Sequence, residues 1–179
     1  MRPGSSTVDE PLESQEDPID ATPAERALAA IAATGVPFEV TRHGHVNGLE
    51  EAAAARGLEP GRLLKSMVVR RADDDFLFVL VPGGRTISWP KLRALLGVSR
   101  LSMPSAEVAL AVTGYPRGTI TPLGSVPTWP VIADAAMPIG QVSIGGGASG
   151  TAFTVDSQDL ARALGAQVAD VTEPEDAET

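Results

Sequence analysis

Lysine is rare in this chain, and one lysine stands where it could take part in chemistry. The 14 basic residues include only Lys65 and Lys91 as lysines, and arginine fills every other basic position. Lys65 follows the turn Pro60-Gly61 and begins an apolar segment that predicts a β-strand. An ammonium is a compact donor that desolvation can make nucleophilic, whereas a guanidinium keeps its charge. Lys65 is therefore either a functional group or a strand residue whose alkyl stem lies along apolar surface.

Two glycine-containing stretches and one carboxylate are further candidates. Gly118-Thr119-Ile120-Thr121-Pro122 lies in a loop rich in Gly and Pro. Residues 145–147 are three consecutive glycines. They form either a hairpin or bulge, or a place where the absence of side chains lets a ligand approach backbone N–H groups. Asp134 follows an apolar strand and could equally cap a turn or line a site.

Several kinds of chemistry have no support in the sequence. The chain has no cysteine, so it predicts no thiolate nucleophile and no disulfide. His43 and His45 lie in one loop without further patterned ligands, and no Gly-x-Ser-x-Gly motif occurs. We expect no metal and no cofactor.

Charge is divided unevenly along the chain. The net charge is −9. Residues 1–22 hold six acids against Arg2, and residues 173–179 hold four acids without a base, so residues 23–172 are neutral overall. Within this neutral part, residues 56–100 contain nine basic residues and four acidic residues. Such a basic region is either an ordinary solvated surface or a site for a phosphate-bearing partner.

The periodicity predicts one α+β domain. Residues 1–22 are expected to be a disordered acidic tail, 23–172 the folded domain and 173–179 an acidic tail. No apolar run approaches the length of a membrane span, so we expect a cytoplasmic protein. The elements do not alternate as in a doubly wound sheet. Predicted helices are 23–34, 49–56, 88–96, 104–112 and 156–164, and predicted strands are 38–41, 64–71, 75–81, 129–133, 141–144, 151–155 and 166–171.

The order of these features resembles the YbaK/ProX-type aminoacyl-tRNA deacylases, the editing domain also found within some prolyl-tRNA synthetases. The resemblance spans about residues 23–172. Thr119 stands where some members have glycine, and Ser66 where others have threonine, which leaves acceptor specificity open. The matching stretches are Leu64-Lys65-Ser66, Thr113-Gly114-Tyr115, Gly118-x-x-x-Pro122-Leu123-Gly124, the strand ending in Asp134, Gly145-Gly146 and Asp159-Leu160.

The resemblance implies a mixed, barrel-like sheet of about seven strands with helices around it. It also implies a free-standing trans-editing hydrolase that cleaves the ester of misacylated tRNA, such as tRNA for proline carrying Cys, Ala, Ser or Thr. Aminoacyl-tRNA would be the substrate, and prolyl-tRNA synthetase a candidate partner; the oligomeric state stays open.

The resemblance assigns a role to each matching residue. Lys65 and the loop from Gly118 would act on the acylated terminal adenosine, the lysine as an ammonium and the loop through backbone N–H groups. The other residues would bind substrate: Ser66, Thr121, Pro122, Asp134, Gly145 and Gly146.

Two readings compete with this one. The basic region 56–100 would also suit a non-catalytic module that binds RNA or a protein. Alternatively, Lys65 would be an amine that forms a Schiff base.

Overall fold

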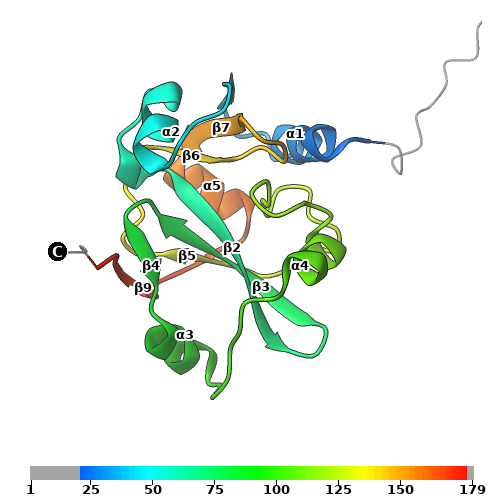
Figure 1. Cartoon of the computed structure of the whole chain (residues 1–179), viewed down its shortest axis with the longest axis vertical. Helices are drawn as coiled ribbons and strands as arrows, with labels where there is room; N and C mark the ends of the chain where they lie inside the picture. The colour runs from blue at the N-terminus through cyan, green and yellow to red at the C-terminus, as the bar shows by residue number, and fades with distance from the viewer. Residues whose placement is uncertain (1–20, 177–179) are drawn as a thin grey trace, which may run out of the picture.

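The computed structural model describes residues 21–176 (Figure 1). Most of the predicted N-terminal tail and the last three residues lie outside them. None of the helices in the described part of the chain has the length and apolar character of a membrane span.

A four-stranded sheet forms the centre of the molecule. Its order is β2-β3-β5-β8. β2 and β3 form an antiparallel hairpin, and β5 and β8 continue the sheet in parallel. The strands are β2 (Leu64–Ala72), β3 (Asp75–Pro82), β5 (Val131–Asp134) and β8 (Gln167–Ala169).

Two smaller sheets complete the β-structure of the described residues. One has the antiparallel order β1-β7-β6, with β1 (Phe38–Arg42), β7 (Thr151–Asp156) and β6 (Gln141–Gly145). The other pairs β4 (Arg85–Ile87) with β9 (Thr172–Pro174). A parallel bridge between Leu63 and Ser143 joins the first two sheets next to the start of β2.

The α+β class is confirmed, but the strand arrangement differs from the prediction. Nine strands in three sheets replace one sheet of about seven, and their pairing does not show barrel closure. Of the predicted strand 166–171 only β8 forms, and the unpredicted β9 follows it and extends into the segment assigned to the acidic C-terminal tail. β4 and β9 have three residues each, which is too short for a periodic signal.

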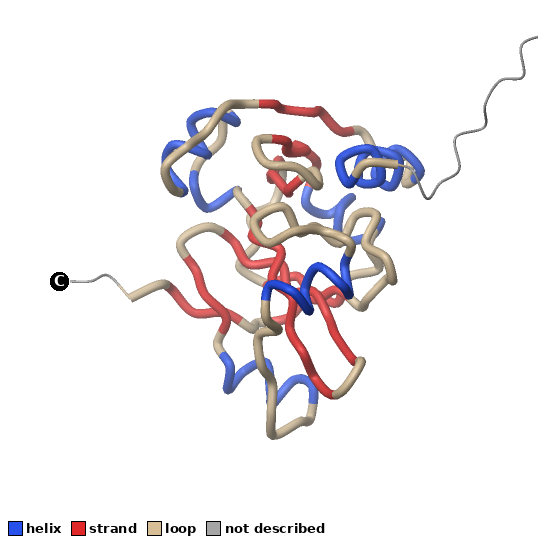
Figure 2. Tube along the Cα trace, turned by 45° about the vertical axis from the view of Figure 1, so that its right-hand side comes forward, coloured by secondary structure: helices blue, strands red, loops and turns tan. Residues whose placement is uncertain are grey.

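Five α-helices and a 3-10 turn surround the sheets in the described residues (Figure 2). Thr22 and Glu25 form a capping box at the start of the first helix. Asp156 is the N-cap of the last helix and accepts from the N–H groups of Gln158 and Asp159. The helices are α1 (Pro23–Ala33), α2 (Leu49–Arg56), η2 (Pro60–Arg62), α3 (Trp89–Leu96), α4 (Ala106–Thr113) and α5 (Ser157–Ala163).

The core lies on both faces of β3, as its unbroken apolar sequence predicts. Phe76, Phe78 and Leu80 belong to one buried cluster. Leu77, Val79 and Val81 belong to the cluster on the opposite face. Burying each such side chain stabilises the fold by about 1.5–3 kcal/mol. β3 therefore fixes its partner β2, the strand that carries Lys65.

Candidate active site

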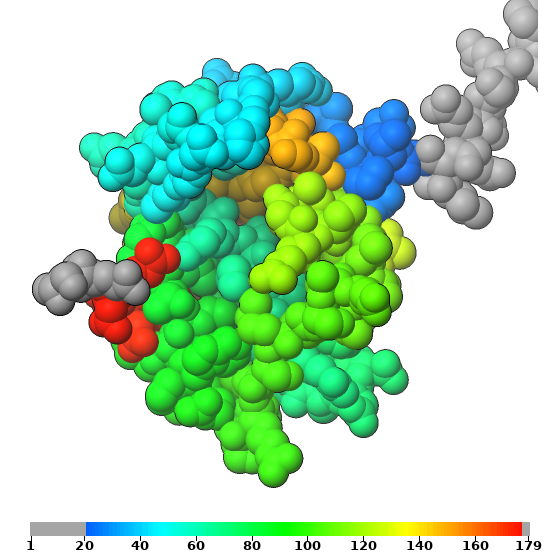
Figure 3. All heavy atoms as spheres, viewed as in Figure 1, coloured from blue at the N-terminus to red at the C-terminus, as the bar shows by residue number. Residues whose placement is uncertain are grey.

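A cavity of about 610 Å³ brings together four of the predicted site residues. Lys65 and Ser66 come from the start of β2, Gly118 from the loop after α4, and Gly145 from the end of β6. Figure 3 shows the surface hollowed between the teal segment around residue 65 and the yellow-green segment around residue 118. Much of the remaining wall is apolar and includes Leu49, Leu63, Leu64, Met67, Met103, Ala106, Ala109 and Ile120.

Lys65 is held at the edge of this cavity by two acceptors. Its Nζ donates to the backbone carbonyl of Arg85 at 2.7 Å and to a carboxylate oxygen of Glu175 at 3.1 Å. Its side chain is 40% exposed and that of Glu175 is 54% exposed. Exposed ion pairs of this kind contribute about 0–1 kcal/mol. The ammonium is thus directed by the fold but remains available to an anion that enters the cavity.

Ser66 presents a buried hydroxyl to the same cavity. Its Oγ has no hydrogen-bond partner within the described residues, although it is shielded from solvent. An unsatisfied buried polar atom costs about 1–3 kcal/mol. Such an atom beside a cavity is able to bond a ligand or a water molecule that enters it.

The loop 114–124 is fixed from both sides, and this fixes Gly118. The buried Tyr115 donates its hydroxyl to the carbonyl of Leu123 at 2.6 Å, which closes the loop. Arg26 in α1 donates to the carbonyl of Gly114 at 2.6 Å and stacks over the Tyr115 ring at 5.1 Å. Burial raises the pKa of the Tyr115 hydroxyl, and the nearby Arg26 partly opposes this rise.

Gly118 has a backbone conformation that favours glycine. Its φ is +89°, in the left-handed half of backbone space. Within the described residues, the N–H groups of Gly118 and Ile120 donate to no acceptor, and both residues line the cavity. These two N–H groups are candidate donors for a bound oxygen atom.

The two glycines at the end of β6 differ in their surroundings. Gly145 lines the cavity, and a Cβ there would meet only the Ile120 carbonyl, at 3.7 Å. A Cβ on Gly146 would lie 2.8 Å from the Thr151 side chain. Gly146 is therefore explained by close packing within the β6–β7 hairpin, and it does not line the cavity.

Asp134 also lies away from the cavity. It is 1% exposed and accepts hydrogen bonds from the N–H groups of Ala136 at 2.9 Å and Val171 at 3.0 Å. Its carboxylate lies 3.8 Å from Arg85. These contacts anchor the chain just before β9 and account for the burial of the carboxylate; its contact with substrate stays a prediction.

Thr121 and Pro122 are buried in the loop wall behind Gly118 and do not line the cavity. The Thr121 hydroxyl accepts from the N–H of Leu123 at 3.3 Å. Both residues therefore shape the loop that was predicted to bind substrate.

Arg56 is a cavity residue that the sequence analysis did not single out. At the end of α2, it donates to the hydroxyl of Ser143 at 3.1 Å and to Nε2 of His43 at 3.3 Å. His43 Nδ1 lies 2.9 Å from the Gly44 carbonyl, which leaves Nε2 as the acceptor facing Arg56. Burial lowers the pKa of the Arg56 guanidinium. The only signal in the sequence was a single basic residue at the C-terminal end of an alanine-rich helix.

Comparison with known proteins identifies the class to which this fold and cavity belong. The model of the aminoacyl-tRNA editing domain matches residues 43–163. The chain therefore belongs to the aminoacyl-tRNA editing domain family. This confirms the resemblance seen in the sequence and the enzyme class that accompanies it, the aminoacyl-tRNA deacylases.

Individual relatives are of two kinds. The proline–tRNA ligase of Thermosipho melanesiensis is 36% identical over 86 residues, which are 48% of this chain but only 15% of the ligase. EbsC of Enterococcus faecalis, named as a candidate Cys-tRNA(Pro)/Cys-tRNA(Cys) deacylase, is 24% identical over 127 residues, or 70% of this chain and 77% of that protein. A crystal structure described as a candidate trans-editing enzyme for prolyl tRNA synthetase superposes with a TM-score of 0.77 at 26% identity, covering 86% of this chain and 98% of the other.

Proposed function

We propose that this protein hydrolyses the ester bond of tRNA for proline that carries a small, wrong amino acid such as Cys, Ala, Ser or Thr. The observation that carries the proposal is one cavity bordered by an ammonium and by two backbone N–H groups that have no acceptor among residues 21–176. Action in trans is supported by the two relatives of similar size to the chain, the deacylase and the trans-editing enzyme.

The reaction needs little from the protein besides positioning and charge. Water adds to the acyl carbon, the bond from that carbon to the ribose oxygen breaks, and the ribose oxygen takes up a proton. Negative charge develops on the former carbonyl oxygen in the transition state. The N–H groups of Gly118 and Ile120 would stabilise that oxygen, and one preorganised donor contributes about 3 kcal/mol to the barrier.

Lys65 would hold the terminal phosphate or the ester oxygens as an ammonium. Both of its present partners are acceptors, which suits a protonated amine that can only donate. This favours the binding role over a Schiff base. The hydroxyl of Ser66 would contact the aminoacyl group, and Gly145 would leave room for the ester.

The need for such an enzyme follows from the limits of selective binding. One methylene group distinguishes two substrates by about 1–3 kcal/mol, so a synthetase that accepts proline also admits smaller amino acids. A second site that excludes the correct product removes the errors. The volume of about 610 Å³ is within the range of small-molecule sites, about 300–1,000 Å³.

The test is a single-turnover assay with alanyl-, cysteinyl-, seryl-, threonyl- and prolyl-tRNA for proline. We expect cleavage of at least one of the four misacylated forms, slower cleavage of the prolyl form, and loss of activity in both Lys65→Ala and Lys65→Arg. Lys91→Ala is the matched control, because it removes the other lysine, which is paired with Asp170. Binding without cleavage would instead support an RNA-binding module, and an adduct trapped by borohydride would support a Schiff base.

A further inference from the structure

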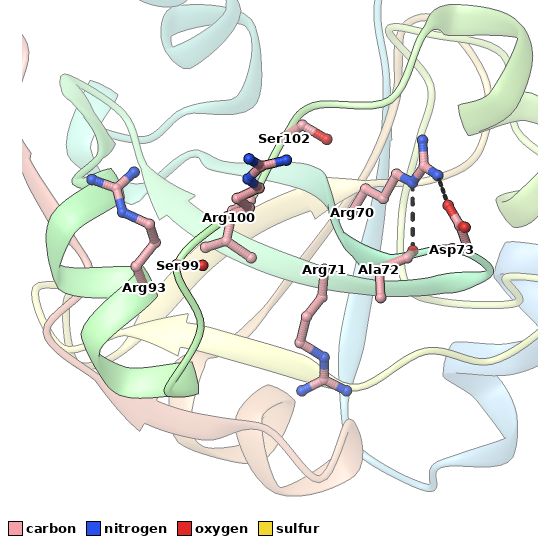
Figure 4. A pocket seen from close by; sticks show the side chains of 9 residues that line it. Arg70, Arg71, Ala72, Asp73, Arg93, Ser99, Arg100 and Ser102 are labelled. Carbon is pink, nitrogen blue, oxygen red and sulfur yellow. Dashed lines mark hydrogen bonds and ion pairs between the residues drawn. The ribbon is translucent and has the colours of Figure 1, made fainter.

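A second pocket, with a volume of about 510 Å³, lies at the far end of β2 and is lined by four arginines (Figure 4). Arg70 and Arg71 end the strand, Arg93 belongs to α3, and Arg100 to the loop that follows α3. Arg71 points to the opposite side of β2 from the other three (Figure 4), as alternation along a strand requires. We call Arg70, Arg93 and Arg100 the arginine ridge.

The loop that carries Arg100 is fixed to β2. The N–H of Arg70 donates to the carbonyl of Ser102 at 2.8 Å, and the N–H of Ser102 donates to the carbonyl of Arg70 at 3.1 Å. This reciprocal pair holds the residues around Arg100 beside the end of the strand. The ridge is therefore a fixed feature of the fold.

The ridge carries positive charge that the described residues do not neutralise. Arg93 and Arg100 form no ion pair and no side-chain hydrogen bond within residues 21–176. Arg70 pairs with Asp73, whose side chain is 94% exposed. Such an exposed pair is weak and yields readily to a competing anion. Planar guanidinium groups match the oxygen atoms of phosphate particularly well.

The same two segments that build the ridge also build the candidate active site. β2 runs from Lys65 and Ser66 in the cavity to Arg70 on the ridge, with Ser66 and Arg70 on the same face of the strand. The loop before α4 runs from Ser99 in the arginine-lined pocket to Met103 in the cavity wall. Five strand residues from Lys65 to Arg70 span about 17 Å at about 3.3 Å each. At about 3.4 Å of rise per nucleotide, this equals about five nucleotides of a stacked strand.

We propose that the arginine ridge binds backbone phosphates of the RNA strand whose acylated 3′ end occupies the cavity. The proposal rests on the proposed function and adds the path of the substrate across the surface. The terminal nucleotide lies at Lys65, and the phosphates about five nucleotides upstream reach the ridge at Arg70, where Arg93 and Arg100 add to the positive charge. These contacts set affinity and register but read no base.

The test measures binding of uncharged tRNA to the full chain by fluorescence anisotropy, so it does not depend on catalysis. The double variant R93Q/R100Q is compared with the wild type and with R42Q. Arg42, in β1 of the other sheet, is also exposed and forms no ion pair within the described residues. We expect the double variant to bind at least about tenfold more weakly at low salt. We also expect its slope of log K against log salt to fall by about 1.5, and R42Q to match the wild type.

Fragment length provides the second measurement. RNA fragments with the tRNA 3′ end should gain affinity for the wild type once they exceed about five nucleotides, and the double variant should lack this gain. If the double variant and R42Q bind tRNA with equal affinity, the proposal is overturned. This holds even if the double variant no longer binds a synthetase, because the ridge would then be a protein-binding surface. An equal loss with short and long fragments would overturn it too. If the wild type binds RNA with this length dependence but cleaves no aminoacyl-tRNA, the proposed function is wrong and the proposal that the arginine ridge binds RNA stands.

Discussion

The ion pair between Lys65 and Glu175 allows a quantitative test of how the candidate active site receives its substrate. Glu175 follows β9, and its N–H donates to the carbonyl of Gly84 at 2.9 Å, so the strand pairing brings its carboxylate to Lys65. An entering phosphate or ester would compete with this carboxylate for the ammonium. Because the two side chains are 40% and 54% exposed, the pair is worth about 0.2–1 kcal/mol.

Glu175→Gln should therefore tighten substrate binding by about 1.4- to 5-fold. The maximal single-turnover rate should stay unchanged, because Lys65 keeps its hydrogen bond to the Arg85 carbonyl. The assay is the dependence of deacylation rate on protein concentration at low and high salt, and screening should reduce the difference at high salt. Glu173→Gln is the matched control, since it removes one charge two residues away, in β9, from a side chain that does not pair with Lys65. Weaker binding or a lower maximal rate in Glu175→Gln would refute this reasoning, because the carboxylate would then be helping the lysine.

Five further substitutions separate structural from functional roles. Ser66→Ala removes a buried hydroxyl without a partner and should raise the free energy of unfolding by about 1 kcal/mol while slowing deacylation; a lower melting temperature would contradict this. Gly118→Ala should cost about 1–2 kcal/mol through its left-handed backbone, measured by urea unfolding, and should slow deacylation more than Gly145→Ala, whose Cβ meets only an ordinary contact. Asp134→Asn should lower stability by about 1–3 kcal/mol and leave the deacylation rate unchanged well below the melting temperature; a slower rate at unchanged stability would restore the predicted contact with substrate. Tyr115→Phe should cost about 1–3 kcal/mol at pH 8. Because burial raises the pKa of Tyr115, the native state keeps its proton above about pH 10, where the unfolded chain releases it; wild-type stability should fall above that pH, and the Phe variant should lack this contribution.

The sequence predicted those parts of the site that depend on local backbone chemistry. Lys65 and Ser66 were expected at a strand start because a turn precedes an apolar run, and the structure has them there. The loop conformation at Gly118 was foreseeable from its glycine and proline content. Their convergence on one cavity is a property of tertiary structure, which only the family resemblance anticipated.

The predicted site residues that lie outside the cavity have an ambiguous sequence context in common. A carboxylate after a strand, such as Asp134, has the same sequence context whether it binds a ligand or accepts backbone N–H groups. Likewise, a glycine such as Gly146 has the same context whether it admits a ligand or a neighbouring hairpin strand. Only the contacts distinguish these cases. Arg56 and β9 were missed because their partners are distant in sequence: Arg56 bonds Ser143, and β9 pairs with β4.

Thr119 shows where selectivity can and cannot reside in this site. Its N–H and its hydroxyl both donate to the carbonyl of Pro116, at 3.0 Å and 2.8 Å. Asp74 is the sole non-glycine residue with positive φ within the described part of the chain, so threonine at 119 meets no backbone strain. The side chain therefore stabilises the turn and fixes the direction of the adjacent N–H groups. In the proposed function those donors belong to the backbone and act alike on any aminoacyl ester, so discrimination between amino acids would come from the side chains of the wall, where Ser66 lies with Ala106 and Ala109 of α4.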